Sequence, residues 1–157
     1  MTGNEKFMKE AIRIGIEGMR SGCGGPFGCV IIKDDAIVGR GCNTVVSTND
    51  PTAHAEIVAI RDACKNLQSF QLSGCEIYTS CEPCPMCMSA IYWARPAKVY
   101  YANSRTDAAN IGFDDLFIYE EIALPLEQRK INMECVCSNE AKKMFEEWMI
   151  MNNKILY

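Results

Sequence analysis

The sequence predicts one α/β domain over residues 1–157, with three layers in which helices cover both faces of a five-stranded mixed sheet. Three observations support this fold class. A length of 157 residues suits one domain and leaves no room for two ordinary ones. The apolar share of 48% and charged share of 23% are those of a soluble globular protein. Strand-like and helix-like patterns alternate along the chain after an opening helix and hairpin.

The first part of the chain predicts a helix, a hairpin and a second helix. Apolar side chains recur at helical spacing over residues 7–19, and the glycine-rich run 22–26 ends that helix. The runs GCVIIK and AIVGRGC, separated by Asp34 and Asp35, predict two antiparallel strands. Helical spacing returns over residues 53–67.

The second part predicts three further strands and two helices. The runs CEIYTS, AKVYYA and INMECVC have strand character, and residues 85–94 predict a helix that opens with a proline in its first turn. Residues 105–128 are the least regular segment and are expected to form a long loop beside a pocket. Residues 139–151 predict a closing helix. The side chains expected to be buried on that helix are Met144, Trp148 and Met151.

Charge and hydropathy restrict the possible partners. The net charge is −4 and no cluster of five or more Lys and Arg residues occurs, which argues against a polynucleotide substrate. No apolar run approaches the ~20 residues that a membrane span requires. The first residues also lack the apolar block of a signal peptide. We therefore expect a cytoplasmic protein with no membrane partner.

The chain has ten cysteines, and two interpretations are open. One is a secreted disulfide framework, which the missing signal peptide and the chain length disfavour. The other is a reduced protein in which a few thiols bind metal and the remainder pack as small apolar groups. Six cysteines lie within apolar patterns and are expected in the core: Cys29, Cys42, Cys64, Cys75, Cys135 and Cys137.

The segment Cys84–Pro–Met–Cys87 has a spacing that lets two thiolates reach one metal ion at a helix N-terminus. Such a motif alone also occurs in redox dithiols and structural zinc sites. His54 is the single histidine of the chain and supplies a third candidate ligand. One His and two Cys leave the fourth position of a tetrahedral zinc site open for water.

Glu56 follows His54 by two residues, at the start of the second predicted helix. Helical positions i and i+2 point to different sides, so both can serve one site only above the first helical turn. H-x-E combined with P-C-x-x-C is the established signature of zinc nucleobase deaminases, in which the glutamate moves protons without binding zinc. A closed structural Cys₄ site with Cys81 as a ligand is the alternative, and it would leave Glu56 without a role.

Beyond these motifs, the chain resembles the cytidine deaminase superfamily and is most similar to the bacterial guanine deaminases. The matching stretches are Gly24–Gly28, Asn49–Glu56, Tyr78–Cys87, Ile91–Pro96 and Gly112–Asp115. The resemblance implies a cytidine-deaminase-like fold, one Zn²⁺ per chain, and hydrolysis of guanine, a small purine base, to xanthine and ammonia. His54, Cys84 and Cys87 would hold the metal, and Glu56 would act as general base and then as general acid.

The resemblance also implies five substrate contacts. Asn43 would hydrogen-bond the purine and Asp115 would pair with its polar edge, although Asn43 also suits a strand-end turn and Asp115 a solvated loop. Phe27 and Trp93 would flank the ring by stacking, where ordinary core packing is the alternative. Tyr157 would close the pocket, although a terminal residue is commonly frayed.

Similar guanine deaminases form homodimers that exchange the C-terminal segment, so Tyr157 could serve the partner's site. The amphipathic helix over 139–151, which has a second apolar side with Phe145 and Ile150, gives weak support, and a monomer fits the same pattern. Three alternative functions remain: a deaminase of cytosine or of a nucleoside such as guanosine, a tRNA adenosine deaminase, and a structural zinc-binding interaction module.

Overall fold

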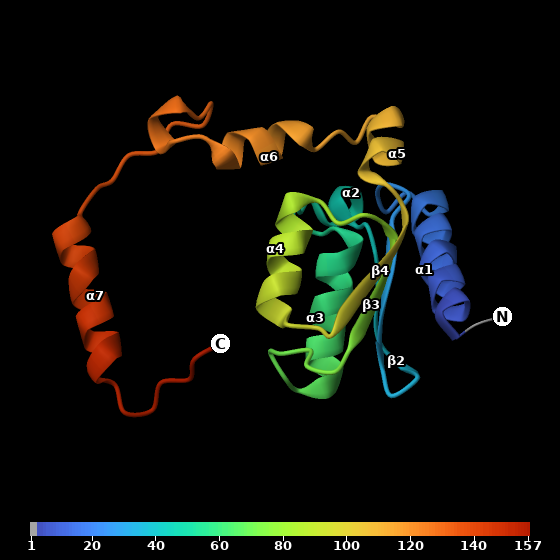
Figure 1. Cartoon of the computed structure of the whole chain (residues 1–157), viewed down its shortest axis with the longest axis horizontal. Coiled ribbons are helices and arrows are strands. Elements are labelled where there is room, and N and C mark those ends of the chain that lie inside the picture. The colour runs from blue at the N-terminus through green and yellow to red at the C-terminus, as the bar shows by residue number, and fades with distance from the viewer. Residues whose placement is uncertain (1–2) are drawn as a thin grey trace. The chain divides into compact units, whose positions relative to one another are not determined.

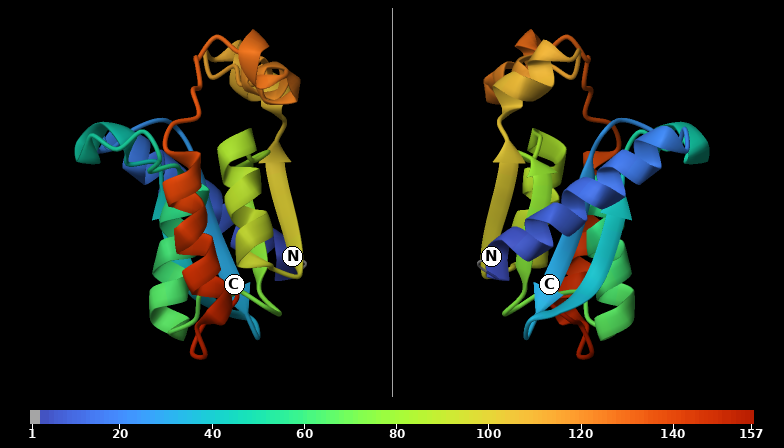
Figure 2. Two further views of the ribbon diagram at one scale, coloured as in Figure 1. Left: turned by 90° about the vertical axis from the view of Figure 1, so that its left-hand side faces the viewer. Right: turned by 90° about the vertical axis from the view of Figure 1, so that its right-hand side faces the viewer.

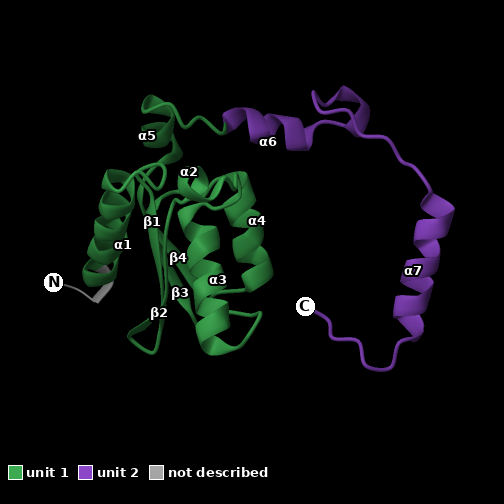
Figure 3. Cartoon of the chain, turned by 180° about the vertical axis from the view of Figure 1, so that it is seen from behind, with its two compact units in different colours: residues 1–115 green, residues 116–157 purple. Residues whose placement is uncertain are grey.

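The computed structural model describes residues 3–157, and the described residues form two compact units, one up to residue 115 and the other over residues 116–157 (Figure 3). The first unit contains the sheet and five of the helices. The second contains two α-helices and a short 3₁₀ helix. Over the described residues, every helix is too short or too polar to cross a bilayer.

The first unit is built around a mixed sheet (Figure 1). Its four strands, in the order β2-β1-β3-β4, are β1 (Gly28–Lys33), β2 (Ala36–Cys42), β3 (Glu76–Cys81) and β4 (Lys98–Asn103). Strand β1 pairs antiparallel with both β2 and β3, whereas β3 and β4 are parallel. The hairpin and the strands expected from CEIYTS and AKVYYA are therefore confirmed.

The prediction of a fifth strand is wrong. Residues 131–137 form no strand in the part of the chain that the structure describes, and the sheet has four strands. These residues belong to the second unit, where no element is a strand with which they could pair. Their alternating pattern suits a strand, but a strand needs a hydrogen-bonded neighbour to form.

Helices cover both faces of the sheet and make three layers (Figure 2). Helix α1 (Gly3–Arg20) packs on one face, where Phe7 and Ala11 contact Val30 and Tyr78. Helices α3 (Ala55–Leu67) and α4 (Pro85–Ala94) pack on the other face. Small side chains on α3, including Ala59 and Ala63, allow this helix to lie close to the sheet.

Two short helices complete the first unit. Helix α2 (Val45–Thr48) follows β2, and α5 (Arg105–Asn110) follows β4. Helix α5 lies within the segment expected to be a long irregular loop, and that expectation is wrong. Ser104 and Asp107 form a capping box in which each side chain accepts a hydrogen bond from the backbone N–H of the other.

The second unit consists of α6 (Leu116–Ala123), a 3₁₀ turn at Leu126–Gln128 and α7 (Ser138–Ile150). Helix α7 confirms the expected closing helix to within one residue at each end. The expected buried stripe is not buried, because Met144, Trp148 and Met151 are 63%, 39% and 46% exposed. The unit is too small to build a core around this helix.

All ten cysteines are free thiols. Cys29 and Cys75 are buried and Cys42 and Cys64 are half-buried, as expected for thiols that pack as small apolar groups. Cys135 and Cys137 are exposed, so the expectation that they lie in a core is wrong. Both belong to the second unit, whose residues are exposed from Lys130 onward.

Candidate active site

The starts of α3 and α4 provide the candidate ligands. His54 is the residue before the first turn of α3, and Cys84 stands in the same position before α4, where Pro85 opens the helix. Both residues have extended backbone conformations. A Cβ atom at Gly41 of β2 would collide with the carbonyl oxygen of Ala55, so glycine there lets the sheet approach the start of α3 closely.

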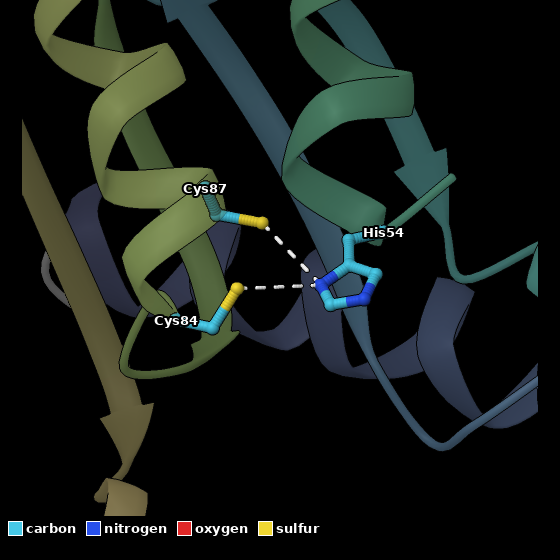
Figure 4. Close-up of side chains that lie close together, drawn as sticks. All are labelled: His54, Cys84 and Cys87. Carbon is cyan, nitrogen blue, oxygen red and sulfur yellow. Dashed lines mark hydrogen bonds between the residues drawn. The ribbon is translucent and has the colours of Figure 1, made fainter. Parts of the chain in front are cut away.

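The three candidate ligands point toward one another (Figure 4). Nδ1 of His54 lies 3.5 Å from Sγ of Cys84 and 3.5 Å from Sγ of Cys87. The three donor atoms all lie within 4.8 Å of one another. Tetrahedral zinc, with Zn–N near 2.1 Å and Zn–S near 2.3 Å, places such ligands about 3.6 Å apart. The observed distances therefore fit one zinc ion with a fourth position for water.

The thiol chemistry favours a cation at this position. A hydrogen bond from the Cys87 thiol lowers the pKa of Cys84 to about 4, and the same contact raises the pKa of Cys87. Two adjacent thiols can both ionise only if a positive charge lies between them. The Cys81 thiol instead faces the carbonyl oxygen of Ser104 at 3.6 Å and lies outside the ligand group, which argues against a closed Cys₄ site.

Glu56 lies in the first turn of α3 and is 6% exposed. Oγ1 of Thr79 donates a hydrogen bond of 2.9 Å to Oε1 of Glu56. Burial raises the pKa of Glu56, and the hydrogen bond from Thr79 partly opposes that effect. A buried carboxyl group with a raised pKa is suited to accept and release a proton near neutral pH. Glu56 is not among the grouped ligands and remains available for such transfers.

Backbone hydrogen bonds link Asn43 to Phe27 and link the residue after Asn43 to the residue before His54. The N–H of Asn43 donates to the carbonyl of Phe27 at 3.0 Å, and the N–H of Thr44 donates to the carbonyl of Ala53, which precedes His54. The Asn43 side chain is 6% exposed, and its Oδ1 accepts a hydrogen bond from the N–H of Val45 at 3.2 Å.

The rings of Phe27 and Phe113 form one wall beside Asn43. They meet edge to face with centroids 5.0 Å apart, and a Cβ atom at Gly25 would lie 2.9 Å from the Phe27 ring and 3.0 Å from the Phe113 ring. A Cβ atom at Gly24 would likewise collide with Oδ1 of Asn43. The glycine pair therefore allows the loop to close against the aromatic rings and the amide.

Asp115 ends the first unit and is half-buried. Burial raises the pKa of its carboxyl, and the negative charge of Cys84 raises it further. The aspartate is thus close enough to interact electrostatically with a candidate metal ligand.

Trp93 lies away from the start of α4, where Cys84 is found. Trp93 is 62% exposed near the C-terminal end of α4. The rise along a helix places it about 13 Å from Cys84 at the opposite end. The position of Trp93 on α4 gives no support to the expected stacking on a substrate ring, which stays a prediction. Tyr157 belongs to the second unit and is 70% exposed.

Thr79 and Phe113 are two residues of the candidate site that the sequence patterns do not predict. Thr79 occupies an inward position of β3, on the same side as Ile77, and a hydroxyl at an apolar position is the signal that identifies it. Phe113 is 47% exposed, and its ring contact with Phe27 depends on the path of the loop after α5.

Residues 1–103 match the family described as "Cytidine and deoxycytidylate deaminase zinc-binding region". The chain is 54% identical to the guanine deaminase of Bacillus subtilis, over 98% of this chain and 99% of that protein. The crystal structure of that guanine deaminase superposes with a TM-score of 0.95 and covers 98% of each chain.

Two further relatives are less similar. The tRNA-specific adenosine deaminase of Aquifex aeolicus is 35% identical over 98% of this chain and 99% of that protein. A guanine deaminase structure from Nitrosomonas europaea is 31% identical, covers 69% of this chain and 63% of that chain, and has a TM-score of 0.66.

Proposed function

The chain belongs to the cytidine and deoxycytidylate deaminase family, and we propose that it is a guanine deaminase that hydrolyses guanine to xanthine and ammonia. The observation that carries the proposal is the position of Glu56, buried beside the cluster of His54, Cys84 and Cys87. The 54% identity to a guanine deaminase over nearly the whole chain supports guanine as the substrate.

His54, Cys84 and Cys87 would hold one Zn²⁺ per chain. When bound, zinc supplies a water molecule whose pKa is lowered toward neutrality. Oε1 of Glu56 already accepts a hydrogen bond from Thr79, and we assign Oε2 as the atom that would accept the water proton. Glu56 would then deliver that proton to a ring nitrogen of the purine, take up the remaining proton of the attacking hydroxyl as the new carbonyl forms, and pass this second proton to the departing amine. The carboxyl is therefore base first and acid afterward, and ammonia leaves.

Asn43 and Asp115 select the purine in this proposal. Because Oδ1 of Asn43 accepts the N–H of Val45, the amide presents its Nδ2 group to the base as a donor. Asp115 accepts hydrogen bonds from the N–H groups on the polar edge of guanine. Phe27, held by Phe113, supports one face of the ring.

We also propose a homodimer that acts in purine metabolism in the cytoplasm. The apolar side chains of α7 support a subunit contact, since Phe145 and Ile150 are 67% and 79% exposed. Exchange of the C-terminal segment between subunits would allow Tyr157 to close the partner's pocket.

The substrate proposal is tested by ammonia release from the zinc-loaded protein with guanine, adenine, cytosine and guanosine. Adenine lacks the 6-oxo group and N1 hydrogen of guanine, and each buried polar group left unpaired costs about 1–3 kcal/mol. We therefore expect guanine to exceed adenine and cytosine by at least about 100-fold in kcat/KM. A higher kcat/KM for cytosine or guanosine would contradict the guanine assignment.

The same assay tests Asp115. Asp115→Asn should reduce the preference for guanine by about 10-fold or more while zinc content stays unchanged, because the amide replaces an acceptor with a donor. Asp114→Asn is the matched control, since it makes the same change one residue earlier and should retain the preference. Equal losses in the two variants would remove the specific role of Asp115.

A further inference from the structure

Thr79 is a polar residue in an apolar row of the sheet. It pairs with Cys29 of β1 and Tyr101 of β4, and its side chain is 1% exposed. Its neighbours on the same face, Ile77 and Cys29, belong to the core that packs against α3 and α4. A hydroxyl buried among such groups costs free energy unless it forms a hydrogen bond. The partner of this hydroxyl therefore indicates why the residue is there.

That partner is Glu56, whose Oε1 accepts a hydrogen bond of 2.9 Å from Oγ1 of Thr79. Strand β3 is hydrogen-bonded on both sides, by β1 and by β4, so the backbone of Thr79 is fixed in the centre of the sheet. The hydroxyl thus joins a rigid strand to a carboxyl at the start of α3. A carboxyl group tethered through one oxygen keeps its second oxygen in a defined direction.

We propose that Thr79 is a positioning residue for the deamination, holding Oε1 of Glu56 so that Oε2 faces the water and the substrate. The inference rests on the proposed function, because it assigns Thr79 to the proton transfers of Glu56. Thr79 itself touches no reacting atom. Its contribution is the orientation of the carboxyl, and displacements of about 1 Å in such groups can cost about 100-fold in rate.

Two substitutions separate positioning from packing. Thr79→Val keeps the volume and branching of the side chain but removes the hydroxyl. Thr79→Ser keeps the hydroxyl but removes a buried methyl group, and it is the matched control. For both variants, kcat and KM with guanine, zinc content and the thermal unfolding midpoint should be measured against the wild-type protein.

Positioning predicts that Thr79→Val lowers kcat about 10- to 100-fold, with KM changed less than about threefold and zinc retained. Thr79→Ser should keep kcat within about threefold of wild type even though its unfolding midpoint falls. The inference is overturned if Thr79→Val retains wild-type kcat, if Thr79→Ser is as slow as Thr79→Val, or if Thr79→Val loses zinc. A wild-type protein that releases no ammonia from guanine would instead overturn the proposed function.

Discussion

The two units of the chain differ in what they bury. The first unit encloses polar groups of the candidate site, since Glu56 and Asn43 are each 6% exposed and Thr79 is 1% exposed. In the second unit even large apolar side chains such as Ile150 are 79% exposed. The first unit thus has a core and a complete set of candidate metal ligands, whereas the second has apolar surface without a core. The proposed catalysis therefore belongs to the first unit, and the proposed subunit contact to the second.

The second unit is held by local contacts. The guanidinium of Arg129 donates to the carbonyls of Ile122 and Leu124 at 3.0 Å each, at the end of α6. Such contacts cap a helix but bury little apolar area. Helices of this length are marginal in water without a packed face, so α7 needs a further surface to cover its apolar side chains.

Substitution of a candidate metal ligand should have the largest effect, which is the loss of bound zinc from the first unit. His54→Ala, Cys84→Ala and Cys87→Ala should each reduce bound zinc to well below one equivalent per chain, because two remaining ligands hold the ion weakly. Cys135→Ala removes an exposed thiol of the second unit and is the control. Elemental analysis measures the zinc content. Zinc loss in Cys135→Ala would break the assignment of the metal to the first unit.

Glu56→Gln should have the next largest effect, which is a loss of turnover. The amide has nearly the same size but cannot accept and relay a proton, so turnover of guanine should fall by about 10²–10⁴-fold or more. Bound zinc should stay at the wild-type level, because Glu56 is not among the grouped ligands. Steady-state kinetics and zinc analysis on the same sample check both statements. Turnover near the wild-type rate in a zinc-replete variant would refute the proposed proton transfers.

Substitutions on α7 should have the smallest effect on bound zinc. They test whether the second unit forms the proposed subunit contact. Phe145→Asp combined with Trp148→Asp places two charges on one side of the helix and should convert a dimer to a monomer with zinc unchanged. Lys143→Glu combined with Glu146→Lys is the control, with the same spacing and no apolar residue changed. Light scattering gives the molar mass. An unchanged mass in the Asp variant would exclude this side of α7 from the subunit contact.

The same difference explains how far the sequence could predict the fold. In the first unit, local sequence patterns agree with the tertiary packing, and the sequence predicts α4 from its first residue, Pro85, to its last, Ala94. In the second unit, residues 131–137 have the pattern of a strand but no neighbouring strand, because pairing depends on distant contacts. The sequence also carries a capping signal for the start of α5, at Ser104 and Asp107.

The candidate site could be predicted from the sequence only where its residue types are rare in the chain. A single histidine and a C-x-x-C motif leave few combinations, and the structure brings His54, Cys84 and Cys87 together. Thr79 carries a weaker signal, a hydroxyl at an inward position of a strand; hydroxyl residues are common in strands, and only the contact with Glu56 gives this one a role. Trp93 matches a family stretch in sequence, yet its place at the far end of α4 follows only from the helix geometry.

The open zinc site is tested most directly by X-ray absorption spectroscopy of the zinc-loaded protein. Ligation by His54, Cys84, Cys87 and one water predicts two sulfur atoms near 2.3 Å and two nitrogen or oxygen atoms near 2.0–2.1 Å. That result would place one exchangeable position at the metal, as hydrolysis requires. A first shell of three or four sulfur atoms would show that a further cysteine closes the site, and it would contradict the catalytic assignment.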